Sequence, residues 1–270
     1  MRVALEIEFD GVGFSGTQIQ SGSGERTVQG LLAEVLSSII GQPVLPMPAS
    51  RLDAGVGAEA LTVSAEIPFL PGQSALADQP LGEAVGLRNL GLALAGMLPA
   101  DISVRRVAVV PPQWHAQIYA INKTYRYHVV ARGTKPARET RCWWVKRIDH
   151  PERLQLLADQ LLGTKDLRGF ACLRHDDTDT NDGARAITEA RWEQRDDTQI
   201  LHLTGTGFLY KQIRGFVGAM VHVAQGRRTM QDFSALVAGQ TIRRMGNLAP
   251  AAGLVLERVG YSPAPQWIHL

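Results

Sequence analysis

The sequence is poor in cysteine and in long apolar runs, and each scarcity excludes a class of protein. Its 270 residues include only two cysteines, Cys142 and Cys172, whose spacing fits no metal motif, so we expect two ordinary thiols in a reducing compartment. The longest apolar stretch, near residues 90–98, is interrupted by two glycines and closed by Pro99, too early to cross a bilayer. The first ten residues alternate apolar and acidic side chains without a secretory signal. We therefore expect a cytoplasmic protein that begins at Met1 and has no membrane anchor.

Excess charge of one sign is also lacking, since the net charge is +2. Any nucleic-acid surface must then depend on where the charges lie. Residues 1–60 carry three arginines against seven acidic residues, whereas residues 123–147 carry eight basic residues against Glu139 alone. Arginine outnumbers lysine 23 to 5, which suits bidentate phosphate contacts, although genomic composition bias explains this equally well. Residues 123–147 are a candidate basic patch.

Apolar periodicity predicts alternating strands and helices. Residues 3–9 alternate as in a strand with one buried face, and residues 28–40 follow helical spacing between Thr27 as N-cap and Gly41 as stop. The other predicted elements are strands near 44–49 and 61–67, a helix ending at Leu98, strands over 102–110 and 124–130, a helix opened by Pro151 and closed by Gly163, a hairpin over 187–205, helices over 210–225 and 230–238, and a last strand over 253–261. The order βαββαβ occurs twice. This predicts an α+β protein of two ferredoxin-like halves with antiparallel sheets, residues 1–112 and 113–270.

Gly11, Gly13 and Gly16 form the pattern G-x-G-x-x-G after the first strand, which in another context indicates a dinucleotide site. Here residues 17–25 separate the third glycine from the helix that it should open. The next predicted elements also include two strands instead of the parallel βαβ unit that such a site requires. We predict no nucleotide cofactor.

An acidic run over residues 175–183 has some features of a calcium loop, because Asp177, Asp179 and Asn181 have ligand spacing. The glycine comes one position late, however, and Thr188 stands where the loop needs a bidentate glutamate. A solvated acidic turn is the favoured interpretation, and no metal site is predicted.

The segment over residues 49–58 places Arg51 and Asp53 two residues apart at the end of a strand, where both side chains can point the same way. Two interpretations stay open from the residues alone. Asp53 is either a turn residue before Gly55 or a carboxylate that takes part in a reaction.

One face of the helix predicted over 210–225 combines basic with small residues: Lys211, Arg214, Gly215, Gly218 and His222. Small residues beside cations let an RNA backbone or another segment of the chain approach closely. A packed helix with an arginine at its rim explains the same pattern.

The strand over residues 123–127 puts Tyr125 and Tyr127 on one face and Arg126 on the other. Aromatic side chains on a sheet beside basic residues can stack RNA bases. Tyrosines in strands more often belong to the core, so both interpretations stay open.

Six ordered segments together resemble the bacterial tRNA pseudouridine synthase A family over most of the chain. They are residues 9–11 with Phe14, Gly16 and Gln18; residues 27–29; residues 51–56; residues 114–116 with Ala120, Lys123, Tyr125 and Tyr127; Phe208, Arg214, Val217 and Gly218; and residues 249–251 with Gly253, Leu254 and Leu256. No single segment is decisive, but the ordered set at compatible spacings is hard to obtain by accident.

The resemblance implies the pseudouridine synthase fold, with the two halves facing a central RNA-binding cleft, and isomerisation of uridines in the anticodon arm of tRNA. It implies that Asp53 is the catalytic carboxylate, as nucleophile or base, that Arg214 pairs with it, and that Tyr125 stacks on the uracil. Arg51 would fill the gap left by the flipped nucleotide or hold a phosphate. The full set of substrate-binding residues that it implies is Arg51, Lys123, Arg126, Lys211 and Leu254.

The implied reaction transfers no group and changes no oxidation state, so neither a metal nor an organic cofactor is expected. The expected partner is tRNA. Members of the family are typically homodimers, and a homodimer is therefore expected here.

The sequence departs from the family pattern at five positions. The signature Gly-Arg-Thr-Asp-Ala-Gly-Val-His has Ser50, Leu52 and Gly57 here in place of its glycine, threonine and histidine. Thr17 stands where an aromatic residue is usual, and Gln117 where an arginine follows the His-Ala pair. Because the implied catalytic residues are present, we expect the chemistry to be retained, whereas the substrate is left open.

Two alternatives compete with a tRNA-modifying enzyme. The first is a non-catalytic paralogue that binds RNA, and the second is a pseudouridine synthase that acts on a different RNA or on a free nucleotide. An oxidoreductase that uses a dinucleotide has the least support.

Overall fold

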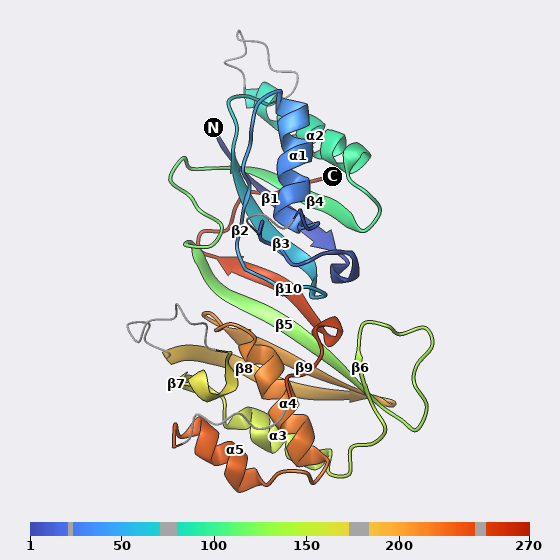
Figure 1. Cartoon of the computed structure of the whole chain (residues 1–270). Coiled ribbons are helices and arrows are strands. Elements are labelled where there is room, and N and C mark those ends of the chain that lie inside the picture. Colours follow the sequence, from blue (N-terminus) through green and yellow to red (C-terminus); the bar gives the residue numbers. More distant parts are fainter. Residues whose placement is uncertain (21–23, 71–79, 173–183, 241–246) are drawn as a thin grey trace. The chain divides into compact units, whose positions relative to one another are not determined.

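A computed structural model describes residues 1–20, 24–70, 80–172, 184–240 and 247–270 (Figure 1). The chain forms two compact units, one of Met1–Ile121 with Leu256–Leu270 and one of Asn122–Val255. These boundaries differ from the division into residues 1–112 and 113–270, since the first unit extends to Ile121 and also includes the C-terminal segment.

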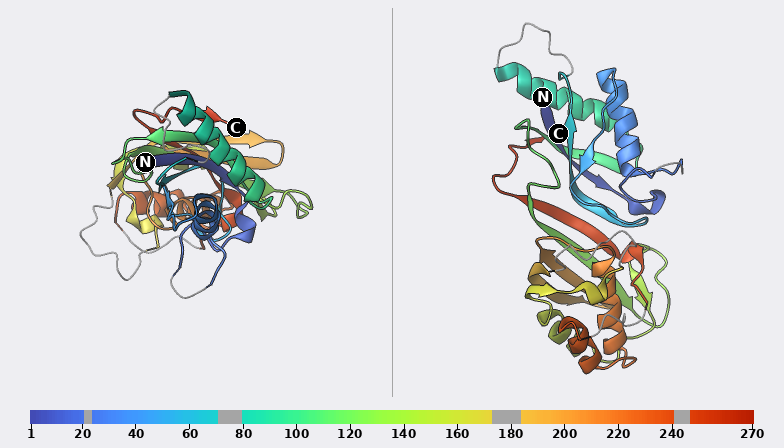
Figure 2. Two further views of the ribbon diagram at one scale, coloured as in Figure 1. Left: turned by 90° about the horizontal axis from the view of Figure 1, so that it is seen from above. Right: turned by 60° about the vertical axis from the view of Figure 1, so that its left-hand side comes forward.

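The first unit follows the predicted order βαββαβ. Its elements are β1 (Arg2–Phe9), the single-turn helix η1 (Gly11–Gly13), α1 (Val28–Ile40), β2 (Met47–Pro48), β3 (Gly57–Glu66), α2 (Pro80–Met97) and β4 (Ile102–Val110), with the short β11 (Ile268–His269) added from the C-terminal segment. The strands lie in the order β11-β4-β1-β3, all antiparallel, and β2 pairs with β3. Helices α1 and α2 contact each other on one side of this sheet (Figures 1 and 2).

Helix α1 begins and ends where its sequence predicts. The Thr27 hydroxyl oxygen accepts a hydrogen bond from the Gly30 N–H at 3.2 Å, which satisfies one of the free donors at the helix start. Gly41 ends the helix in the left-handed conformation with φ of 78°, as is common for glycine.

The second face of strand β1 is buried in the middle of the strand, although Glu8 on that face is exposed, so the prediction of a single buried face was wrong there. Ala4 is fully buried and Glu6 is 6% exposed, although both lie on the face that the pattern assigns to solvent. Glu6 pairs with Arg106 of the neighbouring strand β4, and the Trp267 ring lies 5.0 Å from the Arg106 guanidinium. Residues from the end of the chain therefore cover this face, which local alternation cannot show.

The second unit is more elaborate than a second βαββαβ repeat. Its elements are β5 (Ala120–Ala131, entering from the first unit), β6 (Trp143–Val145), α3 (Glu152–Asp159), β7 (Gly163–Asp166), η2 (Arg168–Phe170), β8 (Ala184–Arg195), β9 (Thr198–Gly205), α4 (Gln212–Ala224), α5 (Met230–Val237), η3 (Ala251–Gly253) and β10 (Leu254–Tyr261), which leads back to the first unit. The strands lie in the order β5-β9-β8-β7, and β6 runs parallel to the end of β5. Helices α3 and α5 both contact α4 (Figure 1).

The predicted hairpin and the helices α4 and α5 are present in this unit, but one local prediction was wrong and two short strands were missed. Helix α3 ends at Asp159, and Gly163, with φ of 94°, begins β7 instead of closing the helix. Strands β6 and β7 were not predicted, because three and four residues are too few to show an alternation.

Both cysteines are free thiols. None of the helices in the described ranges has the length and apolar character needed to span a membrane.

Candidate active site

Asp53 lies in the loop between β2 and β3, where a tight turn sets the backbone. The Val56 N–H donates to the Asp53 carbonyl oxygen at 3.1 Å, and Gly55 has φ of 82°. A positive φ at the third position is that of a type II turn, which favours glycine. Asp53 is half-buried, whereas Arg51 is exposed. The predicted turn is present, and it leaves the Asp53 side chain partly accessible.

The glycines after β1 pack against this turn. We call residues 10–17 the glycine loop. A Cβ on Gly11 would lie 2.3 Å from the Val56 carbonyl carbon, and one on Gly16 would lie 2.8 Å from the Leu52 carbonyl oxygen. Such distances are too short for any side chain, so glycine permits the two loops to meet backbone to backbone. Gly11 and Gly16 therefore serve the packing of the Asp53 loop, and the pattern does not open an α-helix.

Thr17 joins the two loops by hydrogen bonds on both sides of Leu52. Its hydroxyl accepts from the Leu52 N–H at 2.9 Å and donates to the Ser50 carbonyl oxygen at 3.4 Å. The Thr17 N–H donates to the Leu52 carbonyl oxygen at 3.2 Å. Thr17 is 1% exposed, so water does not compete for these bonds. The backbone of the residue before Asp53 is fixed at both its N–H and its C=O.

Arg26 holds the glycine loop from another side. Its guanidinium donates to both carboxylate oxygens of Asp101, at 2.6 and 2.8 Å, and to the Gly13 carbonyl oxygen at 3.1 Å. It also lies 4.0 Å from the centre of the Phe14 ring. The hydrogen bonds from Arg26 hold the pKa of Asp101 below its ordinary value. Sequence reasoning did not find this pair, because Arg26 and Asp101 are far apart in the chain.

In the second unit, Tyr125 and Tyr127 are both buried on one face of β5. The Tyr125 ring meets the Phe208 ring edge-on, with centroids 5.3 Å apart. The Tyr127 hydroxyl donates to the Pro250 carbonyl oxygen at 2.7 Å, and burial raises its pKa. A Cβ on Gly253 would lie 2.6 Å from the Tyr127 ring. Tyr127 is thus a core residue, as one of the two interpretations held.

Arg214 lies in the first turn of α4 and is fixed by the segment that precedes β10. Its Nε donates to the Ala249 carbonyl oxygen at 2.8 Å, and the Ala249 N–H donates to the Arg214 carbonyl oxygen at 3.1 Å. These two hydrogen bonds fix the direction of the Arg214 side chain and the position of its backbone.

The small residues on the same face of α4 admit other parts of the chain. A Cβ on Gly215 would lie 1.9 Å from the Phe170 carbonyl oxygen, and one on Gly218 would lie 2.4 Å from the Asn247 carbonyl oxygen. The sequence left two partners open for this face, an RNA backbone or another segment of the chain. Beside these two glycines the partner is another segment of the chain.

The remaining predicted substrate-binding residues of the second unit lie on different elements. Lys123 lies on the tyrosine face of β5, where burial lowers its pKa, and Arg126 lies on the opposite face. Lys211 precedes α4 in the left-handed conformation with φ of 59°, and its ammonium lies 4.7 Å from the Tyr210 ring centre. Leu254 is buried at the start of β10.

In the part of the chain that the structure describes, no group of three or more His, Cys, Asp or Glu side chains is placed to hold a metal ion. The acidic run over residues 175–183, for which a solvated turn was favoured, lies outside the described residues.

Comparison with known proteins decides the family. Residues 157–262 match the family model of tRNA pseudouridine synthases. A relative from Solidesulfovibrio magneticus, named tRNA pseudouridine synthase A, is 33% identical over 96% of this chain and 91% of its own length. The protein of that name from Halalkalibacterium halodurans is 32% identical over 95% of this chain and 91% of its own length. The one from Leuconostoc citreum is 31% identical over 96% of this chain and 96% of its own length. The chain belongs to the tRNA pseudouridine synthase A family. This confirms the resemblance, and the mixed α/β architecture agrees with the pseudouridine synthase fold.

Two departures from the pattern of this family, at residues 17 and 52, lie in contact with each other. The pattern has an aromatic residue at the first position and a threonine at the second. Here the hydroxyl comes from Thr17 and bonds to the backbone of Leu52. At Gly57, where the pattern has histidine, a Cβ would lie 3.2 Å from the Phe9 carbonyl oxygen, which leaves little room for a side chain.

Proposed function

We propose that this protein is a tRNA pseudouridine synthase, an isomerase that converts uridine in tRNA into pseudouridine, and that Asp53 is its catalytic carboxylate. One observation carries the assignment of Asp53. This carboxylate of the family signature lies half-buried on a loop whose backbone is fixed by Thr17 and by a type II turn. Catalysis by a carboxylate depends on such placement, because a small displacement of a reacting group is costly in rate.

The proposed reaction breaks the bond between ribose C1′ and uracil N1 and forms a bond between C1′ and uracil C5. Asp53 either attacks C1′ or removes a sugar proton so that the uracil detaches. The uracil turns and rejoins through C5, the C5 proton is lost, and N1 gains a proton. No atom other than protons is exchanged and no electron is transferred, so the reaction needs neither a metal nor an organic cofactor.

The other proposed roles follow from charge and shape. A guanidinium beside a carboxylate favours its ionised form, which is the role of Arg214, and the contacts with Ala249 give Arg214 a fixed direction. Tyr125 stacks on the flipped uracil, while Arg51 holds phosphate or fills the vacated space. Lys123, Arg126, Lys211 and Leu254 contact the substrate RNA.

Three finer assignments belong to the same proposal. The modified uridines lie in the anticodon arm, the protein acts as a homodimer, and it acts in the cytoplasm. The first two are typical of the tRNA pseudouridine synthase A family, and free thiols suit the third.

The test is tritium release from tRNA transcripts labelled at uracil C5, because that hydrogen leaves when pseudouridine forms. We expect Asp53→Asn to lower turnover by about a thousandfold or more while tRNA binding persists, as for other essential catalytic groups. The matched control is Glu59→Gln, which neutralises a carboxylate of β3 outside the Asp53 loop and should retain wild-type turnover.

Other outcomes separate the alternatives. Tight tRNA binding without turnover by the wild-type protein would favour the non-catalytic paralogue. Turnover of uridine nucleotides, or of another RNA but not of tRNA, would favour the altered-substrate alternative.

A further inference from the structure

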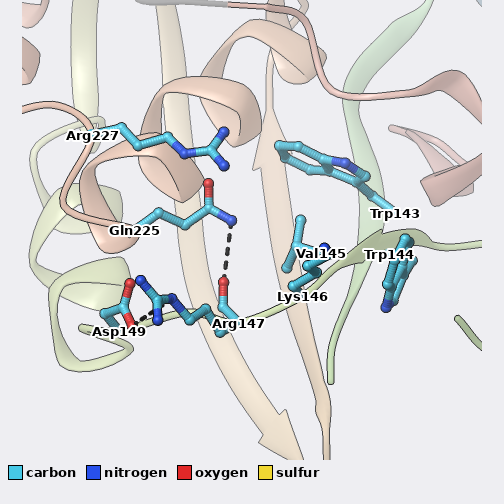
Figure 3. A pocket seen from close by; sticks show the side chains of 8 residues that line it. All are labelled: Trp143, Trp144, Val145, Lys146, Arg147, Asp149, Gln225 and Arg227. Atoms are coloured by element: carbon cyan, nitrogen blue, oxygen red, sulfur yellow. Dashed lines mark hydrogen bonds and ion pairs between the residues drawn. The ribbon is translucent and has the colours of Figure 1, made fainter. Parts of the chain in front are cut away.

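A pocket of about 510 Å³ lies on the second unit, between the segment over residues 143–149 and the end of α4 (Figure 3). Its volume is within the range of small-ligand sites. Its walls are residues 143–147 with Asp149, Gln225 and Arg227. None of these residues belongs to the catalytic machinery proposed above, and the pocket includes the end of the basic segment over residues 123–147.

The pocket carries excess positive charge. Arg147 pairs with Asp149 at 3.1 Å, and two further cations, Lys146 and Arg227, are exposed at its walls. Three cations against one acid give the lining a net charge of +2. Phosphate groups of a nucleic acid complement such a surface.

An aromatic ring stands beside these cations. Trp143 is partly exposed and extends its indole toward Arg227 from the opposite side of the pocket (Figure 3), whereas the Trp144 indole N–H donates to the Arg132 carbonyl oxygen at 2.9 Å. The Gln225 amide nitrogen donates to the Arg147 carbonyl oxygen at 3.1 Å, but its Oε1 has no hydrogen-bond partner within the described residues. Trp143 thus offers a stacking surface for a base, whereas the Gln225 Oε1 is buried and does not face a ligand.

The pocket lies at the far end of the strand that carries Tyr125. Trp143 pairs with Val129, four residues beyond Tyr125, which corresponds to about 13 Å along a strand. Both sites belong to the second unit. An RNA strand with one nucleotide at Tyr125 can therefore place another nucleotide, a few positions away, at this pocket.

We propose that this pocket binds an unpaired nucleotide of the substrate RNA, with the base stacked on Trp143 and phosphates held by Arg227 and Lys146. The inference rests on the proposed function, because it takes RNA as the substrate. The site adds affinity and register and takes no part in the chemistry.

The test compares Arg227→Glu with Arg228→Glu in the full-length protein. The two variants reverse equivalent charges on neighbouring exposed residues, but only Arg227 lines the pocket. The probe is an unmodified tRNA transcript, with dissociation constants measured across a salt series. We expect Arg227→Glu to weaken binding about tenfold and to reduce the salt dependence by about one counterion, while Arg228→Glu leaves both unchanged.

Stacking is tested by Trp143→Leu and Trp143→Phe, with thermal melting to show that both variants are folded. Loss of affinity in the leucine variant with retention in the phenylalanine variant is expected. Equal effects of the two charge reversals on tRNA binding would overturn the proposal. So would a change of oligomeric state in Arg227→Glu with unchanged RNA affinity, which would make the pocket an interface between copies.

The two proposals can fail separately. If the wild-type protein forms pseudouridine and the two charge-reversal variants have the same KM, the pocket proposal fails while the proposed function stands. If no pseudouridine forms but Arg227→Glu alone weakens RNA binding, the pocket is an RNA site and the proposed function fails.

Discussion

Thr17 holds the backbone next to Asp53 through three hydrogen bonds, two of which use its hydroxyl. Thr17→Val keeps the shape of the side chain but leaves the Leu52 N–H unsatisfied, at a cost of about 1–3 kcal/mol. Because the loop can then shift, we expect kcat to fall about tenfold or more with little change in KM. Steady-state kinetics on a tRNA transcript measures this split.

Thr17→Ser is the matched control, since it retains the hydroxyl and should recover most of the lost kcat. If the valine and serine variants have the same kcat, or if both change only KM, Thr17 does not position Asp53.

Lys123 gives tRNA binding a predicted pH dependence. Burial lowers the pKa of its ammonium group, and a bound phosphate would raise that pKa again. Binding is therefore favoured at pH values below the lowered pKa, where Lys123 is protonated, and is lost as the pH rises through it. We expect the affinity for tRNA to decline at an alkaline pH that is still below the ordinary pKa of lysine.

The measurement is a series of dissociation constants between neutral pH and about pH 10, the range just below the ordinary lysine pKa. Lys123→Arg should remove the decline, because arginine stays protonated throughout. A decline that persists in this variant would assign the effect to another group.

At the scale of elements, helix α4 depends on glycine where its neighbours come closest. A Cβ on Gly215 would lie 1.9 Å from the Phe170 carbonyl oxygen, and this contact involves backbone that cannot rotate away. We expect Gly215→Ala to lower the free energy of unfolding by about 3 kcal/mol or more, the upper range for overpacking. Chemical denaturation followed by circular dichroism measures the change.

A glycine-to-alanine substitution in helix α2 provides the control for Gly215→Ala. A Cβ on Gly96 would meet no atom within 4 Å, so Gly96→Ala should stabilise the protein by up to about 1 kcal/mol, the difference in helix propensity. Equal effects at the two positions would show that the contact with Phe170 is not what requires glycine.

How far an element is predictable depends on how local its determinants are. Helix α1 has its cap, its apolar spacing and its stop within one segment, so its bounds match those predicted. Strand β6 has three residues and exists because it pairs with the end of β5. The burial of Glu6 likewise depends on Arg106 and on residues near the C-terminus, which no local pattern reveals.

For the whole molecule, the proposed isomerisation makes one further prediction. Because the reaction gains and loses no electrons and transfers no group, enzyme dialysed against EDTA should retain its wild-type rate. The assay uses an anticodon stem-loop RNA at low salt with sodium as the only metal cation, so that metal-dependent folding of tRNA does not enter. If the rate falls more than about tenfold after dialysis and a divalent metal restores it, a metal supplies part of the reduction of the activation barrier.

The sequence proposes residues for the candidate site but not the structure around them. Asp53, Tyr125 and Arg214 are proposed because they stand in ordered segments that resemble a known family. The residues that hold the Asp53 loop in place were not predicted. Thr17 stood out only as a departure from the family pattern, and Gly11 and Gly16 only as part of a family segment and of a failed dinucleotide motif, yet together they fix the loop that carries Asp53.

The sequence by itself determined the strand and helix order of the first unit, the caps of α1 and the family, and it singled out Asp53 as the proposed catalytic carboxylate. These features depend on spacing and residue type, which a single segment contains. Only the tertiary structure decided that the end of the chain rejoins the first unit, that Glu6 is buried, that Thr17 bonds to Leu52 and that Arg227 and Trp143 line one pocket. Each of these depends on groups far apart in the chain, whose meeting is settled by the packing of the whole fold.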